Sequence, residues 1–339
     1  MAYRLGIIGL GKIAQDQHLP VVAKNTDFEL AVVVSSRGPY KDVQSFRTPA
    51  ELFASGIKLD AVSLCMPPEP RFDIARDAID AGLHVLMEKP PTPTVGELDA
   101  ITDHAAKAGR ILFTTWHSQY NAAVDEAKAL LAGKTVTKLH VNWKEDVRHW
   151  HPGQDWIWEP GGFGVFDPGI NAFSIVTKIM PQPIFVSACN LETPKNKTTP
   201  IAAQIRFKPS WFGEADLSAD LDWRQTGEQS WNIFVTTSDG LDLKLMKGGT
   251  ELHVNGTLRT AAPMAEYEDI YVHFAKLLKS GQSHVDGAPL QLVSDCFMLG
   301  RREDTEAFVS SRLRCPPANR MHRCGSRPWD RDHNQADCR

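Results

Sequence analysis

The sequence predicts an α/β protein of two domains, a doubly wound parallel sheet followed by an α+β domain with a large open, mainly antiparallel sheet. Over residues 1–117, short continuous apolar runs alternate with helical segments, which is typical of parallel strands buried on both faces. From about residue 138, apolar and polar residues alternate, as in a sheet with one covered face. The 339 residues suffice for two domains of about 100–200 residues each.

The first domain, residues 1–117, should contain strands and helices in strict alternation. Expected strands are 4–11, 28–36, 59–68, 84–91 and 110–117. Expected helices are 12–25, 48–56, 71–83 and 94–109. The first helix should break near Pro20, because proline lacks the backbone N–H that a helix interior uses.

The second domain, residues 118–310, should bind substrate and mediate oligomerisation. After a helix near 121–132, expected strands are 138–146, 184–193, 201–207, 214–225, 230–240 and 241–256, with hairpin turns at 238–241 and 247–250. Late helices at 266–278 and 289–308 should pack back on the body. The uncovered sheet face is either solvated or a subunit interface, and we expect a homodimer or higher homo-oligomer through it.

Composition excludes several classes of partner. The formal net charge of −4 gives no electrostatic case for nucleic acid. No apolar run approaches the roughly 20 residues that span a bilayer, and the N-terminus lacks the regions of a signal peptide. The expectation is a cytoplasmic protein without membrane or nucleic-acid partners.

The last residues, 311–339, lose apolar periodicity and are expected to form a flexible, atypical tail. They contain Cys315, Cys324 and Cys338, whose spacing fits neither a zinc site nor a redox CxxC pair. Cys65, Cys189 and Cys296 lie in apolar runs and are expected to be core residues. No metal site is predicted.

A glycine motif opens the first helix. Gly9, Gly11 and Ala14 fit GxGxxA directly after a strand, where glycines allow backbone N–H groups at a helix N-terminus to approach a pyrophosphate. The motif predicts a Rossmann-type dinucleotide site, with Gly9, Gly11, Lys12, Ile13 and Pro67 as cofactor-binding residues. A plain strand–helix turn is the alternative.

The second strand ends in Ser35, Ser36 and Arg37 rather than in an acidic residue. An acidic side chain there would hold the ribose hydroxyl of NAD and repel the phosphate of NADP. Hydroxyls and a positive charge suit that phosphate, which favours NADP, or use of both cofactors, over NAD alone. Arg37 could equally be a solvated loop residue.

The fourth strand ends in Glu88, Lys89, Pro90 and Pro91. Ligands of such sheets lie beyond the carboxyl ends of the strands, so Lys89 should point into the crevice where the nicotinamide binds. Glu88 and Lys89 are therefore both expected among the cofactor-binding residues. The prolines fix the backbone, with a cis bond as one option. A lysine here can carry a proton where its surroundings favour the neutral amine; otherwise it is a surface lysine.

Asp167 lies within "GVFDPGIN", residues 164–171, at the expected start of a helix. With Pro168 at the first helical position, Asp167 would be an ordinary N-cap. A capping carboxylate is also rigid enough to be a catalytic partner of Lys89. Both interpretations remain open.

The motifs "GLGKIA", "MEKPP" and "DPGIN", in this order, resemble the Gfo/Idh/MocA oxidoreductase family. Within it, "GKIAQDQHLP", "HVLMEKPP", "WKEDVRHWHPGQDWIWEPGG" and "GVFDPGIN" resemble bacterial D-galactose and L-arabinose 1-dehydrogenases. The resemblance covers about residues 4–308. It implies oxidation of an aldose at C1 to the aldonolactone, with hydride transfer to NAD(P)+.

This sequence departs from the wider family at Asn171, where the family motif has histidine. A neutral amide cannot act as a general base, so proton transfer should fall to Lys89 and Asp167. Which of these is the formal base stays open, because a coupled pair titrates as a unit. Asn171 should instead hydrogen-bond the sugar or hold Lys89.

Substrate recognition is expected from residues 142–158. Carboxylate and imidazole groups can hydrogen-bond sugar hydroxyls, and tryptophan faces pack on the C–H faces of a pyranose. The resemblance implies roles for Glu145, His151, Trp150 and His117, although each is also plausible as an ordinary strand or core residue. The i, i+2 spacing of His149 and His151 does not favour a metal.

Two other function classes remain. An enzyme with this fold could hydrolyse or isomerise a sugar through transient oxidation with a retained nicotinamide, without net cofactor reduction. A non-catalytic sugar or NADP sensor is the third class, which the presence of Lys89 and Asp167 disfavours. The sequence does not separate D-galactose from L-arabinose, which differ by one exocyclic group.

Overall fold

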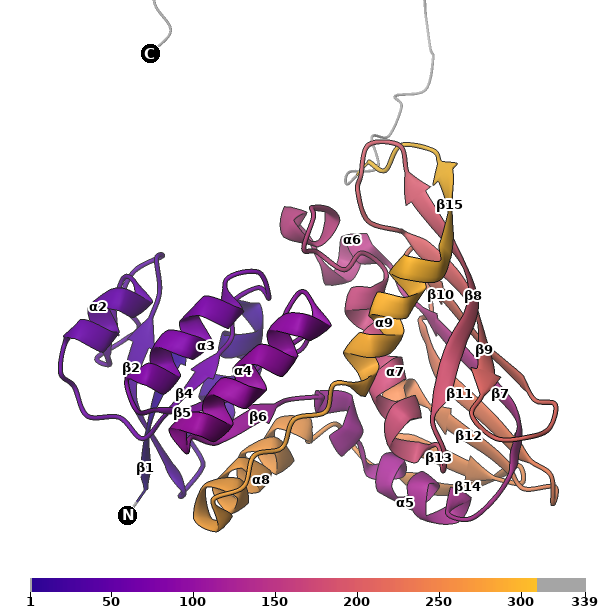
Figure 1. Ribbon diagram of the computed structural model, residues 1–339, viewed down its shortest axis with the longest axis horizontal. Coiled ribbons are helices and arrows are strands. Elements are labelled where there is room, and N and C mark those ends of the chain that lie inside the picture. The colour runs from indigo at the N-terminus through magenta and orange to yellow at the C-terminus, as the bar shows by residue number, and fades with distance from the viewer. Residues whose placement is uncertain (1, 310–339) are drawn as a thin grey trace, which may run out of the picture. The chain divides into compact units, whose positions relative to one another are not determined.

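The computed structural model describes residues 2–309 and confirms the predicted fold class. A parallel sheet of six strands and a mixed, mostly antiparallel sheet of nine strands are joined by the chain after β6 (Figure 1). The predictions for Cys315, Cys324, Cys338 and the tail 311–339 lie outside the described residues.

The six-stranded sheet runs in the order β3-β2-β1-β4-β5-β6 with every pair parallel. Its strands are β1 (Tyr3–Ile8), β2 (Phe28–Val34), β3 (Gln44–Phe46), β4 (Ala61–Leu64), β5 (His84–Met87) and β6 (Leu112–Thr114). The sequence does not predict β3, because a strand of three residues, one exposed and two half-buried, leaves no hydrophobic pattern.

Alternate strand residues supply the two faces of this sheet. In β1, Ile8 joins the apolar cluster beneath one set of helices, whereas Leu5 and Ile7 join the cluster on the other face. The helices that follow the strands are α1 (Leu19–Val22), α2 (Pro49–Ala54), α3 (Arg71–Asp80) and α4 (Val95–Ala108). Helices on both faces make the sheet doubly wound, as predicted.

The helix behind the glycine motif does not break at Pro20, so that prediction is wrong. The chain stays helical through Val22, with a π-helical segment η1 (Ala14–His18) in which the N–H of Leu19 bonds to the carbonyl of Ala14. A π turn widens the helix locally. It accommodates the proline ring and the missing N–H one residue later.

The nine-stranded sheet runs in the order β14-β13-β12-β11-β7-β10-β9-β8-β15. The pairs β7–β10 and β8–β15 are parallel, and the other pairs are antiparallel. The strands are β7 (Val136–Lys144), β8 (Ile184–Pro194), β9 (Ala202–Pro209), β10 (Asp216–Asp222), β11 (Ser230–Thr237), β12 (Asp242–Met246), β13 (Glu251–Val254), β14 (Thr257–Ala261) and β15 (Gly300–Thr305).

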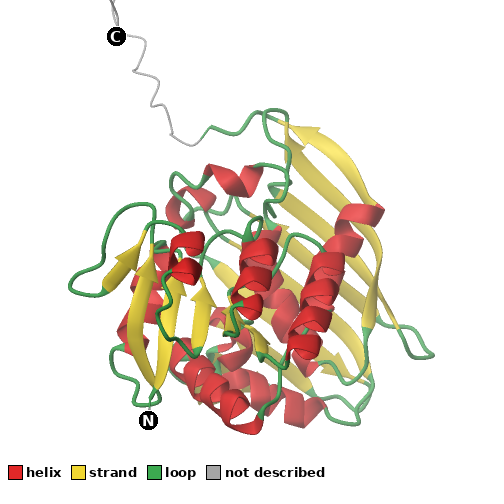
Figure 2. Cartoon of the chain, turned by 60° about the vertical axis from the view of Figure 1, so that its left-hand side comes forward, coloured by secondary structure: helices red, strands yellow, loops and turns green. Residues whose placement is uncertain are grey.

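One face of the larger sheet is covered by α5 (Ala122–Leu131), α7 (Phe166–Ile179) and α9 (Ala288–Leu299) (Figures 1 and 2). Short helices fill the connections: η2 (His117–Tyr120), α6 (Val147–Trp150), η3 (Asp155–Trp158) and η4 (Lys247–Gly249). The opposite face carries half-exposed and exposed side chains, among them Phe185.

Every helix within residues 2–309 is too short or too polar to cross a bilayer.

The second of the late helices is shorter than expected. α9 ends at Leu299, and residues 300–305 form β15 instead of continuing a helix to 308, because they pair with β8 at the sheet edge. α8 (Glu266–Ser280) packs against the first sheet, with the Phe274 ring stacked 5.5 Å from that of Phe28. The domain boundary near residue 117 stays a proposal, since α8 contributes to the core of the first sheet.

Candidate active site

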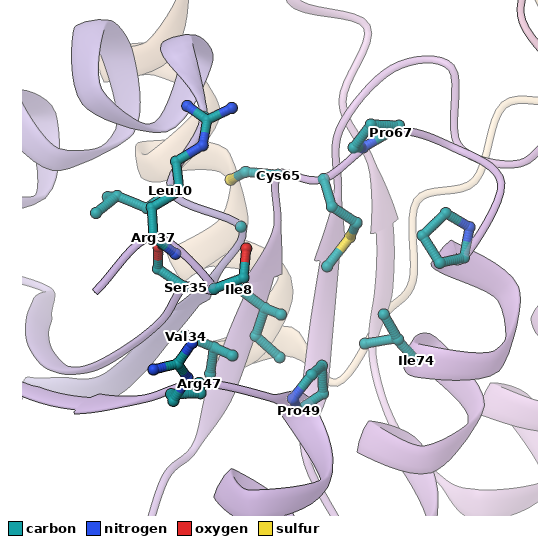
Figure 3. A pocket seen from close by; sticks show the side chains of 15 residues that line it. Ile8, Leu10, Val34, Ser35, Arg37, Arg47, Pro49, Cys65, Pro67 and Ile74 are labelled. Carbon is teal, nitrogen blue, oxygen red and sulfur yellow. The ribbon is translucent and has the colours of Figure 1, made fainter. Parts of the chain in front are cut away.

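A cavity of about 330 Å³ lies at the carboxyl ends of β1, β2 and β4. Figure 3 shows Ser35, Arg37 and Arg47 on one side of it, with Pro67 and Ile74 on the other. The lining residues are Ile8, Gly9, Leu10, Gly11, Val34, Ser35, Ser36, Arg37, Arg47, Pro49, Cys65, Met66, Pro67, Pro70 and Ile74. The cavity therefore joins most of the predicted cofactor-binding residues.

The two motif glycines serve different purposes. Gly9 has φ +96°, and a Cβ there would lie 2.7 Å from the Met66 backbone nitrogen. A Cβ on Gly11 would meet no atom within 4 Å, which leaves room for a ligand to approach the backbone. This cradle fits the pyrophosphate of a nicotinamide dinucleotide.

The end of β2 is organised by Ser35, whose side-chain oxygen accepts a hydrogen bond of 3.1 Å from the Arg37 backbone nitrogen. Arg47, which follows β3, adds a second positive charge to the same cavity. Arg47 carries no signal of this role in the sequence, because the proximity depends on the pairing of β3 with β2. Two arginines and a hydroxyl match the chemistry of a phosphate.

Four of the predicted cofactor-binding residues do not line this cavity: Lys12, Ile13, Glu88 and Lys89. Lys12 is exposed and forms an ion pair with Asp16, and Ile13 packs against the apolar cluster under α8; neither lines the cavity. Glu88 is only 2% exposed, with its carboxylate bonded to His18, Tyr267 and the Lys89 nitrogen. The Glu88 side chain is thus buried and does not line the cavity, and its expected place among the cofactor-binding residues stays a prediction.

Lys89 extends from the end of β5, and the Lys89–Pro90 peptide is cis. Its Nζ donates to the Asp167 carbonyl oxygen at 2.8 Å and lies 3.2 Å from Asp167 Oδ1. The buried guanidinium of Arg71 donates to the carbonyl oxygens of Met66, Glu88 and Pro90. Arg71 thus ties the cofactor cavity to the segment that carries Lys89.

Asp167 is not a helix cap. α7 begins at Phe166 after Val165, which makes no side-chain cap bond, so Asp167 and Pro168 are the second and third helical residues. The Asp167 side chain turns to Lys89 instead. Burial alone would raise the pKa of Asp167, but the charges of Lys89 and His151 outweigh it and lower that pKa, so the carboxylate is ionised at neutral pH.

His151 lies between two carboxylates. Its Nε2 is 3.6 Å from Asp167 Oδ2 and 3.7 Å from Glu145 Oε1. Burial lowers the pKa of His151, but these two carboxylates more than compensate and raise it above its usual value. Lys89, Asp167, His151 and Glu145 therefore form one continuous chain of ionisable groups.

Tryptophans surround the outer end of this chain. Glu145 accepts hydrogen bonds from the indole nitrogens of Trp223 at 3.3 Å and Trp231 at 2.9 Å. Trp150 is 39% exposed and meets Trp231 edge-on, with ring centroids 5.5 Å apart. The sequence does not point to Trp223, just after β10, or to Trp231 on β11, since both are distant in sequence from residues 142–158.

The remaining predicted substrate residues lie nearby. His117 Nδ1 is 3.0 Å from Glu266 Oε2; burial lowers the pKa of His117, while Glu266 and Glu88 outweigh this and raise it. The side-chain amide of Asn171 makes no hydrogen bond within residues 2–309, so of its two expected roles, holding Lys89 is absent there and binding the sugar stays a prediction. Residues 2–309 hold no cluster of three metal-binding side chains.

Comparison with known proteins points to one family. Residues 3–116 match the GFO_IDH_MocA model, an oxidoreductase family with an NAD-binding Rossmann fold. Galactose 1-dehydrogenase of Pseudomonas fluorescens is 41% identical over 305 residues, which cover 90% of this chain and 98% of that protein.

Solved structures extend the comparison. The crystal structure of a D-galactose-1-dehydrogenase protein from Rhizobium etli is 48% identical and superposes with a TM-score of 0.86, covering 91% of this chain and 98% of that one. A variant of KijD10, a 3-ketoreductase from Actinomadura kijaniata, has a TM-score of 0.76 at 15% identity, covering 90% of this chain and 100% of that one. That last similarity supports the fold alone. With a relative of this identity matching almost end to end, and with Lys89 and Asp167 facing each other beside a dinucleotide cradle, the chain belongs to the Gfo/Idh/MocA oxidoreductase family.

Proposed function

We propose that the protein is an aldose 1-dehydrogenase that oxidises D-galactose at C1 to the aldonolactone, with L-arabinose and D-fucose-like pyranoses as further substrates. The observation that carries the proposal is the contact of Lys89 Nζ with Asp167 beside the cofactor cavity. The relatives named galactose 1-dehydrogenase and D-galactose-1-dehydrogenase support D-galactose as the main substrate. We propose NADP as the preferred cofactor, with NAD also accepted.

The residues divide the chemistry between them. A bound nicotinamide supplies the hydride acceptor. The C1–H of the pyranose leaves as hydride while the C1 hydroxyl loses its proton, so that a C1–O double bond forms in the lactone. Lys89 and Asp167 act as the coupled proton acceptor, and the Asp167 carboxylate holds the Lys89 amine in place.

Glu145, His151, Trp150, Asn171 and His117 are proposed to bind the sugar. The Glu145 carboxylate is held by two indole N–H groups, so its orientation is fixed before substrate arrives. Preorganised groups of this kind lower the entropic cost of binding. Exposed indole surface on Trp150 is suited to the apolar C–H face of a pyranose.

A panel of aldoses tests the proposal. Purified protein is mixed with NADP+ or NAD+ and with D-galactose, D-fucose, L-arabinose or D-glucose, and the absorbance of reduced nicotinamide is followed. We expect the fastest reduction with D-galactose. No reduction with any aldose and either cofactor would contradict a dehydrogenase, and sugar conversion without net reduction would indicate a retained nicotinamide.

Replacing Lys89 tests its role in proton transfer. We expect Lys89→Met to lower kcat by about 10²–10⁴-fold, because the amine that accepts the proton is lost while the side-chain length is kept. The affinity for NADP+, measured by isothermal titration, should change little. Lys279→Met, at an exposed lysine paired with Asp27, is the control and should keep full activity. An active Lys89→Met enzyme would remove this residue from the mechanism.

A further inference from the structure

A buried carboxylate lies directly behind the proposed proton acceptor. Glu88 Oε1 accepts hydrogen bonds from His18 Nε2 at 3.0 Å and from the Tyr267 hydroxyl at 2.9 Å. Glu88 Oε2 accepts the backbone N–H of Lys89 at 3.0 Å. One carboxylate thus holds the N-terminal helix, the end of β5 and α8 together.

This cluster is charged and closed to water. His18 is 0% exposed and Glu88 is 2% exposed. Burial opposes ionisation of both groups, but the bond to His18 lowers the pKa of Glu88 to about 2, and the surrounding thiol, hydroxyl and carboxylate groups raise the pKa of His18. A buried ion pair is weak evidence for stability, since apolar residues often serve as well. A specific placement of the groups it holds is therefore the better explanation.

The position of His18 connects the cluster to the cofactor loop. His18 ends the π-helical segment η1, which begins three residues after Gly11. Its Nδ1 lies 2.8 Å from the Tyr271 hydroxyl and 3.2 Å from Ser63 Oγ. The helix whose start forms the glycine cradle is thus fixed, through its other end, to the segment that carries Lys89.

We propose that His18, Glu88 and Tyr267 are positioning residues that hold Lys89 against Asp167 in register with the cofactor cradle. The inference rests on the proposed function, since it assigns these residues a part in proton transfer. None of them lines the cofactor cavity or is among the residues proposed to bind the sugar. They act on the position of Lys89 in two ways: through the hydrogen bond from its backbone nitrogen to Glu88, and through the contacts that hold η1, the end of β5 and α8 together.

A purely structural tether makes a different prediction. If the cluster only attached α8 to the first sheet, its loss would lower thermal stability and leave the turnover of the folded fraction unchanged. If it positions Lys89, its loss lowers kcat while NADP+ binding is retained. The split between kcat and cofactor affinity separates the two.

Tyr267→Phe is the main test variant, because it removes one hydroxyl from the cluster without a cavity. The matched control is Tyr3→Phe, which removes a hydroxyl from a ring packed at the same apolar cluster but outside this network. We expect kcat with D-galactose to fall between about tenfold and about hundredfold in Tyr267→Phe, because small misplacements of reacting groups are costly. The dissociation constant for NADP+ should stay within about threefold.

The second test compares a conservative substitution of His18, which keeps a hydrogen-bond donor, with one that removes it. The His18→Gln side chain still donates to Glu88, whereas His18→Leu does not, so His18→Gln should retain much more of the wild-type kcat. The control pair is His104→Gln and His104→Leu at the exposed His104–Asp80 contact, where both variants should match wild type. Equal kcat in His18→Gln and His18→Leu, in proteins folded by circular dichroism, would overturn the proposal.

A crystal structure of Tyr267→Phe makes the test independent of the substrate. We expect Lys89 Nζ to lie farther from Asp167 Oδ1 than the 3.2 Å of the native chain. An unmoved Lys89 with unchanged kcat would overturn the positioning role. If the native enzyme oxidised no aldose, the proposed function would fail, and the Lys89 position would still decide this inference.

Discussion

At the scale of single residues, Arg37 and Arg47 give the cofactor cavity two positive charges beside Ser35. Each guanidinium can pair with the phosphate that distinguishes NADP from NAD. We expect Arg37→Ser and Arg47→Ser each to weaken NADP+ binding by about tenfold or more, since hydrogen bonds to charged groups contribute about 1.5–3 kcal/mol. Binding of NAD+ should change much less.

Isothermal titration of both cofactors against both variants checks this selectivity. Arg110→Ser, at a half-buried arginine outside the cavity, should leave both affinities unchanged. An equal loss of affinity for NAD+ and NADP+ would show that the arginines do not bind the additional phosphate of NADP+.

Glu88 is expected to make the unfolding free energy of the protein depend on pH in the acidic range. Its folded-state pKa of about 2 lies below the ordinary value of 4.5, so ionised Glu88 stabilises the folded protein above pH 4.5. This contribution, on the order of 3 kcal/mol, is lost as the pH falls from 4.5 toward 2. His18 stays protonated in this window in both the folded and the unfolded chain, so it adds no pH dependence there.

Urea unfolding between pH 5 and pH 2 (roughly the range in which carboxylates protonate) measures the effect. The unfolding free energy of the native chain should fall more steeply with pH than that of Glu88→Gln, which has no group to titrate. Glu69→Gln, at an exposed carboxyl, should follow the native slope. Parallel curves for Glu88→Gln and the native chain would contradict the assignment.

At the scale of elements, the turn between β1 and the first helix contains two glycines with different roles. Gly9 is required for folding, and Gly11 for cofactor binding. A methyl group on Gly9 would collide with the Met66 backbone in a left-handed conformation, whereas one on Gly11 would enter open space. We expect Gly9→Ala to lower the unfolding free energy by about 1–3 kcal/mol. Gly11→Ala should keep native stability and lose NADP+ affinity, because its methyl group occupies the approach of the pyrophosphate.

Thermal unfolding and cofactor titration of the two variants distinguish these roles. The opposite pattern, with Gly11→Ala unstable and Gly9→Ala fully stable, would contradict the geometry of the turn. Val165→Ala, just before α7 at a buried position, should lower stability without a specific effect on cofactor affinity.

At the scale of the whole molecule, the uncovered face of the nine-stranded sheet is the expected subunit interface. Phe185 is 46% exposed on it, and Phe234 lies against His140 in the middle of the sheet with ring centroids 6.3 Å apart. We expect the native chain to be a dimer or larger, and Phe234→Lys to shift it toward monomer, because a buried unpaired charge opposes association.

Light scattering after gel filtration checks the oligomeric state. Val272→Lys, at a 42% exposed position on α8, should leave it unchanged. A monomeric native chain, or a Phe234→Lys protein with the native mass, would place the interface elsewhere or exclude it.

The sequence by itself determined the features that depend on local pattern. Continuous apolar runs predict β1, β2, β4 and β5, and the glycine motif after the first of them predicts the cofactor cradle. Lys89 is expected at the crevice because it follows a strand of the parallel sheet, whereas its pairing with Asp167, which lies on α7, was implied by the resemblance of the two motifs to the family. These predictions work because hydrophobic periodicity and turn chemistry act over a few residues.

Only the tertiary structure decided the features that depend on long-range packing. Arg47 reaches the cofactor cavity because β3 pairs with β2, Trp223 and Trp231 reach Glu145 across neighbouring strands, and Tyr267 reaches Glu88 across 179 positions of the chain. The role of Asp167 at the start of α7 likewise depends on a distant contact, since its side chain forms an ion pair with Lys89 and does not cap its own helix. A side chain with several local options takes the one that its distant neighbours make most favourable, and the identity of those neighbours is set by the fold.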